Sequence, residues 1–225
     1  MIVTYCADRS IYGLLPTAIN SLITNNDVEK IYLIIEDDHI SFINDSRIQL
    51  INALNIDCIV KDGFNCTRQF PYMAMARCAL SKILDDKKVL YLDVDTIVDG
   101  SILDLWNYNT GACPIAARVE NEGYVNSGVL LMNLQQIRAE KYDDRMLDLL
   151  KRCRFAFPDQ DVINLVFKNR IAPIPDYFNK LGRDKEAYET GKMIIRHFAG
   201  ITKPWKDGAT EKDKSLWNKY YVTSI

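Results

Sequence analysis

The sequence has no excess of charge of either sign. Its 225 residues include 28 lysines and arginines and 30 aspartates and glutamates, which gives a net charge of −2. A protein that binds nucleic acid usually carries a basic surface that neutralises phosphates. The balanced charge therefore argues against nucleic acid as the main partner.

Long apolar runs and a secretory signal are also missing. No window holds 18 consecutive apolar residues, so no segment is predicted to span a membrane. The first residues, MIVTYCADRS, lack the basic region and continuous apolar stretch of a signal peptide. We therefore expect a cytoplasmic location, which still allows peripheral contact with a membrane.

Histidine is scarce, and the cysteines follow no metal-binding or disulfide pattern. The two histidines are His39 and His197, and the six cysteines form no C-x-x-C pair. Most of these cysteines lie in apolar runs, where a free thiol behaves as a small hydrophobic side chain. The pattern disfavours a zinc site and favours reduced, buried thiols.

The first half alternates between strand-like and helix-like hydrophobic patterns. Such β-α-β-α alternation predicts an α/β fold with a mostly parallel sheet flanked by helices. The expected strands cover residues 1–7, 30–36, 56–60 and 88–94. The expected helices cover residues 14–26, 41–55 and 71–86.

In the second half of the sequence, strand-like and helix-like patterns alternate less regularly. Residues 180–192 are strongly polar and are expected to form a mobile loop. The expected strands cover residues 112–119, 124–134 and 192–200. The expected helices cover residues 101–106, 134–153 and 158–169.

Two aspartates end the apolar run in KKVLYLDVDTIVDG, at Asp93 and Asp95. Residues i and i+2 of a strand point to the same face, so these carboxylates should project together while Val94 turns away. Ligands of open α/β sheets bind at the carboxyl ends of strands. Neighbouring carboxylates repel unless a cation lies between them, and oxygen ligands suit Mg²⁺ or Mn²⁺. The alternative is a pair of solvated or capping carboxylates, since a second D-x-D occurs at residues 159–161.

A D-x-D after a strand is also similar to the haloacid-dehalogenase-like phosphatases. Their strand ends in D-x-D-x-T/V near the start of the chain. Here Thr96 stands one place early, the motif follows 92 residues, and no later G-D-x-x-x-D pattern occurs. This interpretation is the weaker one.

Four motifs occur over most of the chain: YLDVDTIVDGSILDLW, NSGVLLMNL from Asn126, PDQDVIN from Pro158 and HFAGITKPW from His197. Together they resemble the motifs of glycosyltransferase family 8, a family of retaining enzymes, and they occur in that family's order. Their combination is far more specific than any one of them.

The resemblance implies a GT-A type fold over one domain, residues 1–225. Residues 1–100 would form a Rossmann-like nucleotide-binding half, and residues 101–225 an acceptor and catalytic half. The implied activity moves a hexose, galactose or glucose, from a UDP-sugar to a saccharide, lipid-linked or protein acceptor. A catalytically weak nucleotide-sugar-binding protein of the same fold is the alternative.

The resemblance also implies roles for particular residues. Mn²⁺, with Mg²⁺ as the alternative, would be held by Asp93, Asp95 and His197. The nucleotide and diphosphate would meet Ala7, Asp8, Tyr12, Gly200 and Lys203. The donor sugar would meet Arg77, Asn126, Asp159 and Gln160, of which Asp159 and Gln160 would be catalytic.

Two departures from the family pattern bear on these expectations. The family often has an aromatic residue two or three places after the aspartate matched by Asp8, to stack on uracil, whereas Tyr12 stands one place late. The interval 107–126 is shorter than in many members, which predicts an open acceptor site.

Glutamine is a poor nucleophile, so Gln160 favours a front-face mechanism, in which the leaving diphosphate takes the acceptor's proton, over double displacement.

Overall fold

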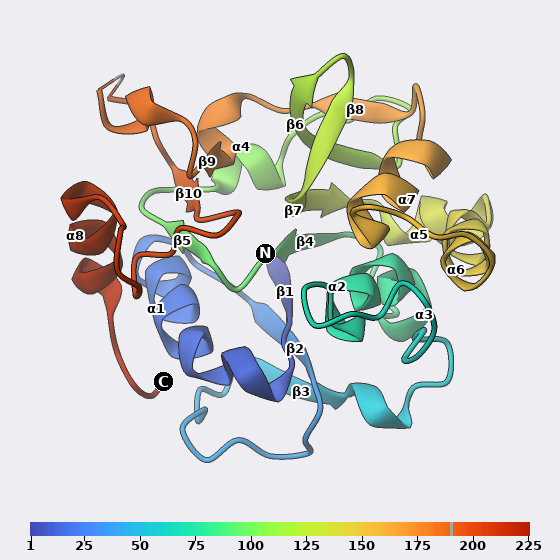
Figure 1. Cartoon of the computed structure of the whole chain (residues 1–225), viewed down its shortest axis with the longest axis horizontal. Coiled ribbons are helices and arrows are strands. Elements are labelled where there is room, and N and C mark those ends of the chain that lie inside the picture. The colour runs from blue at the N-terminus through green and yellow to red at the C-terminus, as the bar shows by residue number, and fades with distance from the viewer. Residues whose placement is uncertain (190) are drawn as a thin grey trace.

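The computed structural model describes residues 1–189 and 191–225. Within these residues a seven-stranded sheet forms the centre of the molecule (Figure 1). Its strand order is β3 (Ile48–Asn52), β2 (Lys30–Ile35), β1 (Ile2–Cys6), β4 (Val89–Leu92), β7 (Tyr124–Met132), β6 (Ile115–Asn121) and β8 (Ile171–Pro173). Strand β7 is antiparallel to β4 and β6, and the other pairs are parallel. The mixed, mostly parallel sheet expected from the sequence is confirmed.

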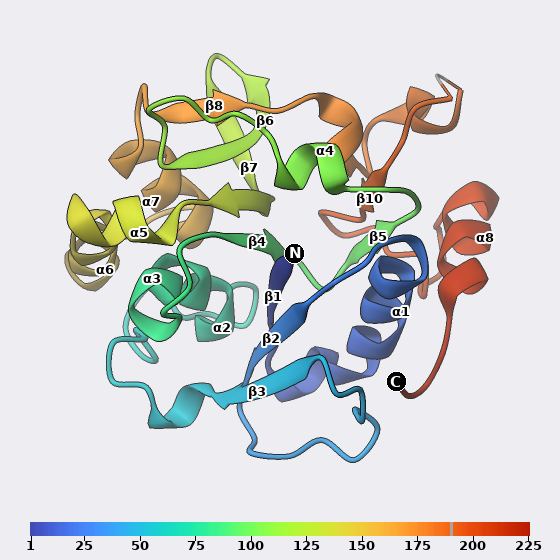
Figure 2. The same ribbon diagram turned by 180° about the vertical axis from the view of Figure 1, so that it is seen from behind.

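Helices cover both faces of this sheet (Figures 1 and 2). Neighbouring strand residues such as Leu33 and Ile34 belong to two different buried clusters, one on each face. Burial on both faces explains why these strands read as continuous apolar runs. One face packs against α1 (Leu15–Asn25) and α4 (Leu103–Trp106). The other packs against α2 (Tyr72–Met75), α3 (Leu80–Ile83), α5 (Leu134–Ala139), α6 (Tyr142–Arg152) and α7 (Pro158–Val166).

The helix expected over residues 41–55 and the strand expected over 56–60 are wrong. This part of the chain contains edge strand β3, which pairs parallel to β2, followed by the short 3-10 helix η2 (Ala53–Asn55). Residues 56–60 take an irregular turn conformation. The apolar residues Ile48, Ile51 and Leu54 imitate a helical period, but pairing to β2 and the β-branched isoleucines favour a strand.

Two long helices expected from the sequence are interrupted. Residues 71–86 form α2, the 3-10 helix η3 (Ala76–Ala79) and α3 in succession. Residues 134–153 form α5 and α6, separated at Lys141, which takes a left-handed backbone conformation with φ of 55°. Both helical regions lie where the sequence predicts them, but each consists of shorter helices rather than one continuous helix.

A second, three-stranded sheet brings the C-terminal part of the chain beside the first half. Its order is β5 (Thr96–Val98), β10 (Ile195–His197) and β9 (Lys180–Leu181). Helix α8 (Glu211–Tyr220) packs on it through a cluster that includes Ile97, Phe198 and Trp217. The expected mobile loop 180–192 thus begins with a strand and includes the 3-10 helix η5 (Lys185–Tyr188); Thr190, within it, lies outside the described residues.

None of the helices in the described part of the chain combines the length and apolar character that crossing a membrane requires.

Candidate active site

The aspartate pair lies in a turn between β4 and β5. Strand β4 ends one residue before Asp93, and residues 94 and 95 form the turn. The Asp93 backbone N–H donates to the Gly128 carbonyl at 2.8 Å, and the Thr96 hydroxyl donates to the Asp93 carbonyl at 2.7 Å. Val94 is buried in the core, as expected. The two carboxylates share a direction because of this turn rather than because of the strand period.

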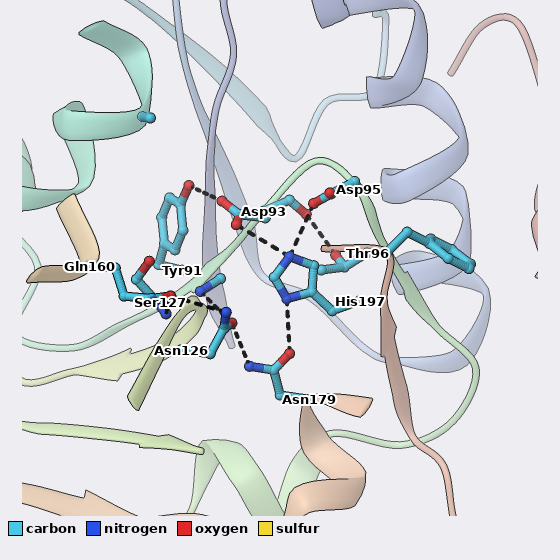
Figure 3. Close-up of polar contacts among 12 residues, drawn as sticks. Tyr91, Asp93, Asp95, Thr96, Asn126, Ser127, Gln160, Asn179 and His197 are labelled. Atoms are coloured by element: carbon cyan, nitrogen blue, oxygen red, sulfur yellow. Dashed lines mark hydrogen bonds and ion pairs between the residues drawn. The ribbon is translucent and has the colours of Figure 1, made fainter. Parts of the chain in front are cut away.

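His197 reaches the same point from β10, where it pairs directly opposite Thr96. Its Nε2 atom lies 3.4 Å from Asp93 Oδ2 and 3.3 Å from Asp95 Oδ1 (Figure 3). Its Nδ1 atom lies 3.0 Å from Asn179 Oδ1. An amide oxygen accepts a hydrogen bond from Nδ1–H, so the lone pair of a neutral imidazole is directed from Nε2 toward the carboxylates.

These three side chains fit a divalent cation. Their potential ligand atoms all lie within 4.8 Å of one another. Two carboxylates and one imidazole suit Mn²⁺, and the carboxylates also suit Mg²⁺. Space is kept open by Gly128, where a Cβ atom would lie 2.1 Å from His197 Cε1 and 2.7 Å from Asp93 Oδ2.

Protein cations balance the charge of the carboxylates. Lys203 Nζ lies 2.5 Å from Asp95 Oδ2. Burial lowers the pKa of His197, but Asp95 and Asp93 outweigh it and raise the pKa to about 9. Burial also raises the pKa of Asp95, and His197 and Lys203 outweigh this and hold it well below its usual range. A metal bound here would replace the charge of a proton on His197, because ligation needs neutral imidazole.

Arg77 joins the cluster of Asp93, Asp95 and His197 to the second D-x-D motif. The buried guanidinium places Nη2 2.8 Å from Asp93 Oδ1 and Nε 3.2 Å from Asp159 Oδ2. It lies over the Tyr91 ring at 4.5 Å and donates to the Ser127 carbonyl at 2.8 Å. Burial lowers the pKa of Arg77, but the two carboxylates outweigh it and raise the pKa well above its usual value.

A chain of side-chain amides connects Gln160 to His197 (Figure 3). Gln160 Oε1 accepts hydrogen bonds from Asn126 Nδ2 and the Ser127 backbone N–H, both at 3.1 Å. Asn126 Oδ1 accepts from Asn179 Nδ2 at 2.9 Å, and Asn179 Oδ1 is the partner of His197. The orientation of Gln160 and the tautomer of His197 are therefore fixed by one network.

Asn179 is a site residue that the sequence reasoning missed. It is fully buried and uses both ends of its amide. It stands in an irregular segment after the 3-10 helix η4 (Asp176–Phe178), where no motif or period distinguishes it. Only the folded chain brings it beside His197.

Most of the predicted site residues line a cleft of about 800 Å³. The sequence predicted its members Arg77, Asp93, Asp95, Asn126, Asp159, Gln160, His197, Gly200 and Lys203. The cleft is also lined by Gln69, Phe70, Ala74, Glu120, Tyr124, Ser127, Phe157, Leu181, Arg183, Ala199 and Ile201, which the sequence did not single out.

The predicted nucleotide-binding residues at the end of β1 lie outside this lining. Ala7 is fully buried, and Asp8 Oδ1 accepts from the Ser10 backbone N–H at 2.8 Å, which caps the 3-10 helix η1 (Arg9–Leu14). The Tyr12 hydroxyl donates to Asp37 Oδ2 at 3.0 Å. That hydroxyl is therefore anchored, and stacking of the ring on a base stays a prediction.

A mixed sheet of this order, shared with the solved structures described below, has the GT-A fold, and an acidic pair and a histidine gather at the end of one of its central strands. The model of glycosyl transferase family 8 matches residues 2–209, and the chain belongs to this family. The resemblance seen in the four sequence motifs is confirmed.

Similar curated proteins include two bacterial glycosyltransferases. Glycosyltransferase GlyE of Streptococcus pneumoniae serotype 4 is 27% identical over 243 residues, covering 97% of this chain and 60% of GlyE. Lipopolysaccharide 1,2-glucosyltransferase of Escherichia coli is 28% identical over 168 residues, covering 60% of this chain and 50% of that enzyme. The chain thus spans only 50–60% of the length of these relatives.

Solved structures repeat the fold. The crystal structure of GlyE from Streptococcus pneumoniae TIGR4 superposes with a TM-score of 0.79 at 25% identity, covering 97% of this chain and 59% of GlyE. The galactosyltransferase LgtC, solved with donor and acceptor sugar analogues, gives a TM-score of 0.77 at 21% identity, covering 99% of this chain and 97% of LgtC. At this identity, the similarity to LgtC supports the fold alone.

Proposed function

We propose that this chain is a metal-dependent, retaining hexosyltransferase that uses a UDP-sugar. The donor sugar is galactose or glucose, and the acceptor is a saccharide, lipid-linked or protein hydroxyl. The carrying observation is the convergence of Asp93, Asp95 and His197 Nε2 on one point. Residues 1–225 work in this proposal as one domain, with a nucleotide-binding half (1–100) and an acceptor and catalytic half (101–225).

The chain's own residues form the diphosphate side. Asp93, Asp95 and His197 would hold Mn²⁺, with Mg²⁺ as the alternative. When bound, such an ion would supply positive charge against the charge that develops on the departing diphosphate. Lys203 is released from Asp95 and directs its ammonium group to the same diphosphate. Gly200, with φ of 93°, lets the backbone of this loop turn close to a phosphate.

The nucleoside lies beyond the diphosphate, toward the end of β1. Ala7 and Asp8 meet the uracil and ribose in this proposal. Tyr12 offers its ring to the base while its hydroxyl stays on Asp37. This part of the proposal rests on the family resemblance, because these residues lie outside the cleft lining.

The donor sugar lies between Arg77, Asn126, Asp159 and Gln160. Asp159 Oδ2 is held by Arg77 and by the Ser127 hydroxyl at 2.8 Å, so it is poorly placed to act as a nucleophile. A front-face reaction suits this arrangement. The acceptor oxygen bonds to the anomeric carbon, the bond from that carbon to the diphosphate breaks, and the acceptor proton passes to the leaving diphosphate.

The test is UDP release from a panel of UDP-sugars, measured with Mn²⁺ and then with EDTA. We expect slow release without acceptor from one donor, abolished by EDTA. The Asp95→Asn variant measures whether that release depends on the metal ligands. Thermal stabilisation by UDP and Mn²⁺ without release would instead support a binding protein. Absence of both effects would overturn the proposal.

A further inference from the structure

Helix α8 lies behind the strand that carries His197. It follows residue 209, the last residue that the family model matches. It packs against α1 and the three-stranded sheet (Figures 1 and 2). Successive residues of a strand point to opposite faces, so Arg196 of β10 is directed to α8 while His197 faces Asp93 and Asp95. The position of His197 therefore depends in part on a helix outside the family match.

A buried ion pair joins β10 to α8. Arg196 and Asp213 are 2% and 6% exposed, and Arg196 Nε donates to Asp213 Oδ1 at 2.9 Å. Arg196 Nη1 donates to the Leu181 carbonyl of β9 at 2.6 Å. Asp213 Oδ1 also accepts from the Tyr188 hydroxyl at 2.6 Å, and Oδ2 accepts from the Thr210 hydroxyl at 2.9 Å. Through this ion pair the helix is tied to both strands and to the segment between them.

Helix α8 also supports the loop that follows β10. The Trp217 ring packs against Phe198 and Trp205, with ring centroids 6.0 Å and 4.5 Å apart. Between these two contacts, Lys203 Nζ donates to the Phe198 carbonyl at 2.6 Å and forms its ion pair with Asp95. The helix therefore contacts both ends of the segment that carries Lys203.

We propose that Asp213 is a positioning residue for the proposed transferase: through Arg196 it fixes the place of β10 and so directs the His197 ring to the two aspartates. The Leu181 carbonyl that Arg196 also holds lies two residues from Asn179, the partner of His197 Nδ1. A buried ion pair gains little net stability over apolar residues of similar volume, whereas its directional bonds favour one arrangement. The inference rests on the proposed function, but the ring position can be measured without turnover.

The first measurement uses the metal-free protein. The chain has two histidines, and His39 is exposed while His197 is buried, so NMR can follow the side-chain nitrogen resonances of each. We expect Asp213→Ala to shift the His197 resonances and to leave those of His39 unchanged. Asp213→Asn keeps an oxygen that can accept from Arg196 and Tyr188, so it should restore the wild-type resonances.

The second measurement is Mn²⁺ affinity by electron paramagnetic resonance titration. It should fall about tenfold in Asp213→Ala and stay within about threefold of wild type in Asp213→Asn, because a displaced imidazole is a poorer ligand. Glu211→Ala is the matched control, because Glu211 lies in the same turn of α8 with its side chain 88% exposed. Tyr220→Phe is the destabilising control, because it removes the hydroxyl that bonds Asp99 at the other end of the helix. Neither control should change the Mn²⁺ affinity.

A double variant keeps the proposal testable if Asp213→Ala does not fold. Arg196→Met combined with Asp213→Leu leaves no unpaired buried charge, so this protein should fold. It should still lose about tenfold in Mn²⁺ affinity, because the bond to the Leu181 carbonyl is gone.

Three results separate the possible roles of Asp213. Wild-type His197 resonances and Mn²⁺ affinity in Asp213→Ala, or in the folded double variant, would overturn the proposal, because Asp213 would then serve only the stability of α8. A loss of Mn²⁺ affinity in Tyr220→Phe as large as that in Asp213→Ala would also overturn it. The expected changes without UDP release from any donor would instead refute the transferase and leave the positioning role standing.

Discussion

The same triplet, D-x-D, occurs twice in this chain and does two different things. Asp93 and Asp95 lie in the turn after β4, and both carboxylates face His197 Nε2. Asp159 and Asp161 lie in the first turn of α7, where residues i and i+2 are about 200° apart around the axis. The backbone around a motif therefore decides whether two carboxylates act together.

In the second triplet the two aspartates have separate partners. Asp159 meets Arg77 and Ser127 at the cleft. Asp161 turns back to the backbone N–H of Phe157 and to the Tyr124 hydroxyl. One carboxylate belongs to the proposed donor site, and the other holds the start of the helix in place.

The largest effect is expected at Asp95. Asp95→Asn keeps the shape of the side chain but removes a charged ligand, so Mn²⁺-dependent UDP release should fall by about 10³-fold. The melting temperature should fall by no more than about 5 °C, because the loss of the attraction of Asp95 to His197 and Lys203 is partly offset by relief of its repulsion from Asp93. Turnover assays and thermal unfolding check both statements. Activity near that of the wild type would remove Asp95 from the metal site.

Gly128→Ala should close the proposed metal site although it replaces none of the proposed ligands. The new Cβ would lie 2.1 Å from His197 Cε1, so the ring must move. We expect the Mn²⁺ affinity, measured by electron paramagnetic resonance titration, to fall about 100-fold. Gly100→Ala is the control, because its Cβ would make ordinary 3.8 Å contacts with Ile194. Equal Mn²⁺ binding by both variants would contradict the role of Gly128.

Variants of Asn179 test whether Mn²⁺ binding at Asp93 and Asp95 depends on a residue outside the four sequence motifs. Asn179→Ala leaves His197 Nδ1 without its partner and removes the Asn179 donor to Asn126 Oδ1, which keeps its bond from the Gly128 N–H. The Mn²⁺ affinity should therefore fall about tenfold. Asn179→Asp keeps an acceptor for Nδ1–H and should restore most of that affinity. A loss of stability in Asn179→Ala with unchanged Mn²⁺ affinity would make Asn179 a packing residue only.

Hydrophobic patterns and short motifs in the sequence predicted the buried strands and the fold class. The buried strands β1, β2 and β4 are continuous apolar runs, and residues of the motifs at Asp93, Asn126, Asp159 and His197 line one cleft. The fold class follows because alternating strands and helices leave few topologies.

Sequence patterns did not predict those features of the structure that depend on contacts between distant parts of the chain. Residues 48–52 became an edge strand because β2 offered a partner, although their apolar spacing also fits a helix. Asn179 became a site residue through partners 18 and 53 positions away along the chain. The turn at residues 94 and 95 also rests on bonds across the fold, from the Asp93 N–H to the Gly128 carbonyl and from the Phe198 N–H to the Asp95 carbonyl.

The smallest effect is expected at Asp161, the helical counterpart of Asp95. Asp161→Ala removes the acceptor of the Phe157 N–H and of the Tyr124 hydroxyl, so it should cost about 1–2 kcal/mol of folding free energy. The melting temperature should fall by about 2–8 °C. Mn²⁺ affinity should stay within about twofold of wild type, because in a helix this carboxylate points away from its motif partner. Loss of Mn²⁺ binding in this variant would mean that the two triplets are not independent, and that Arg77, which contacts Asp93 and Asp159, transmits changes between them.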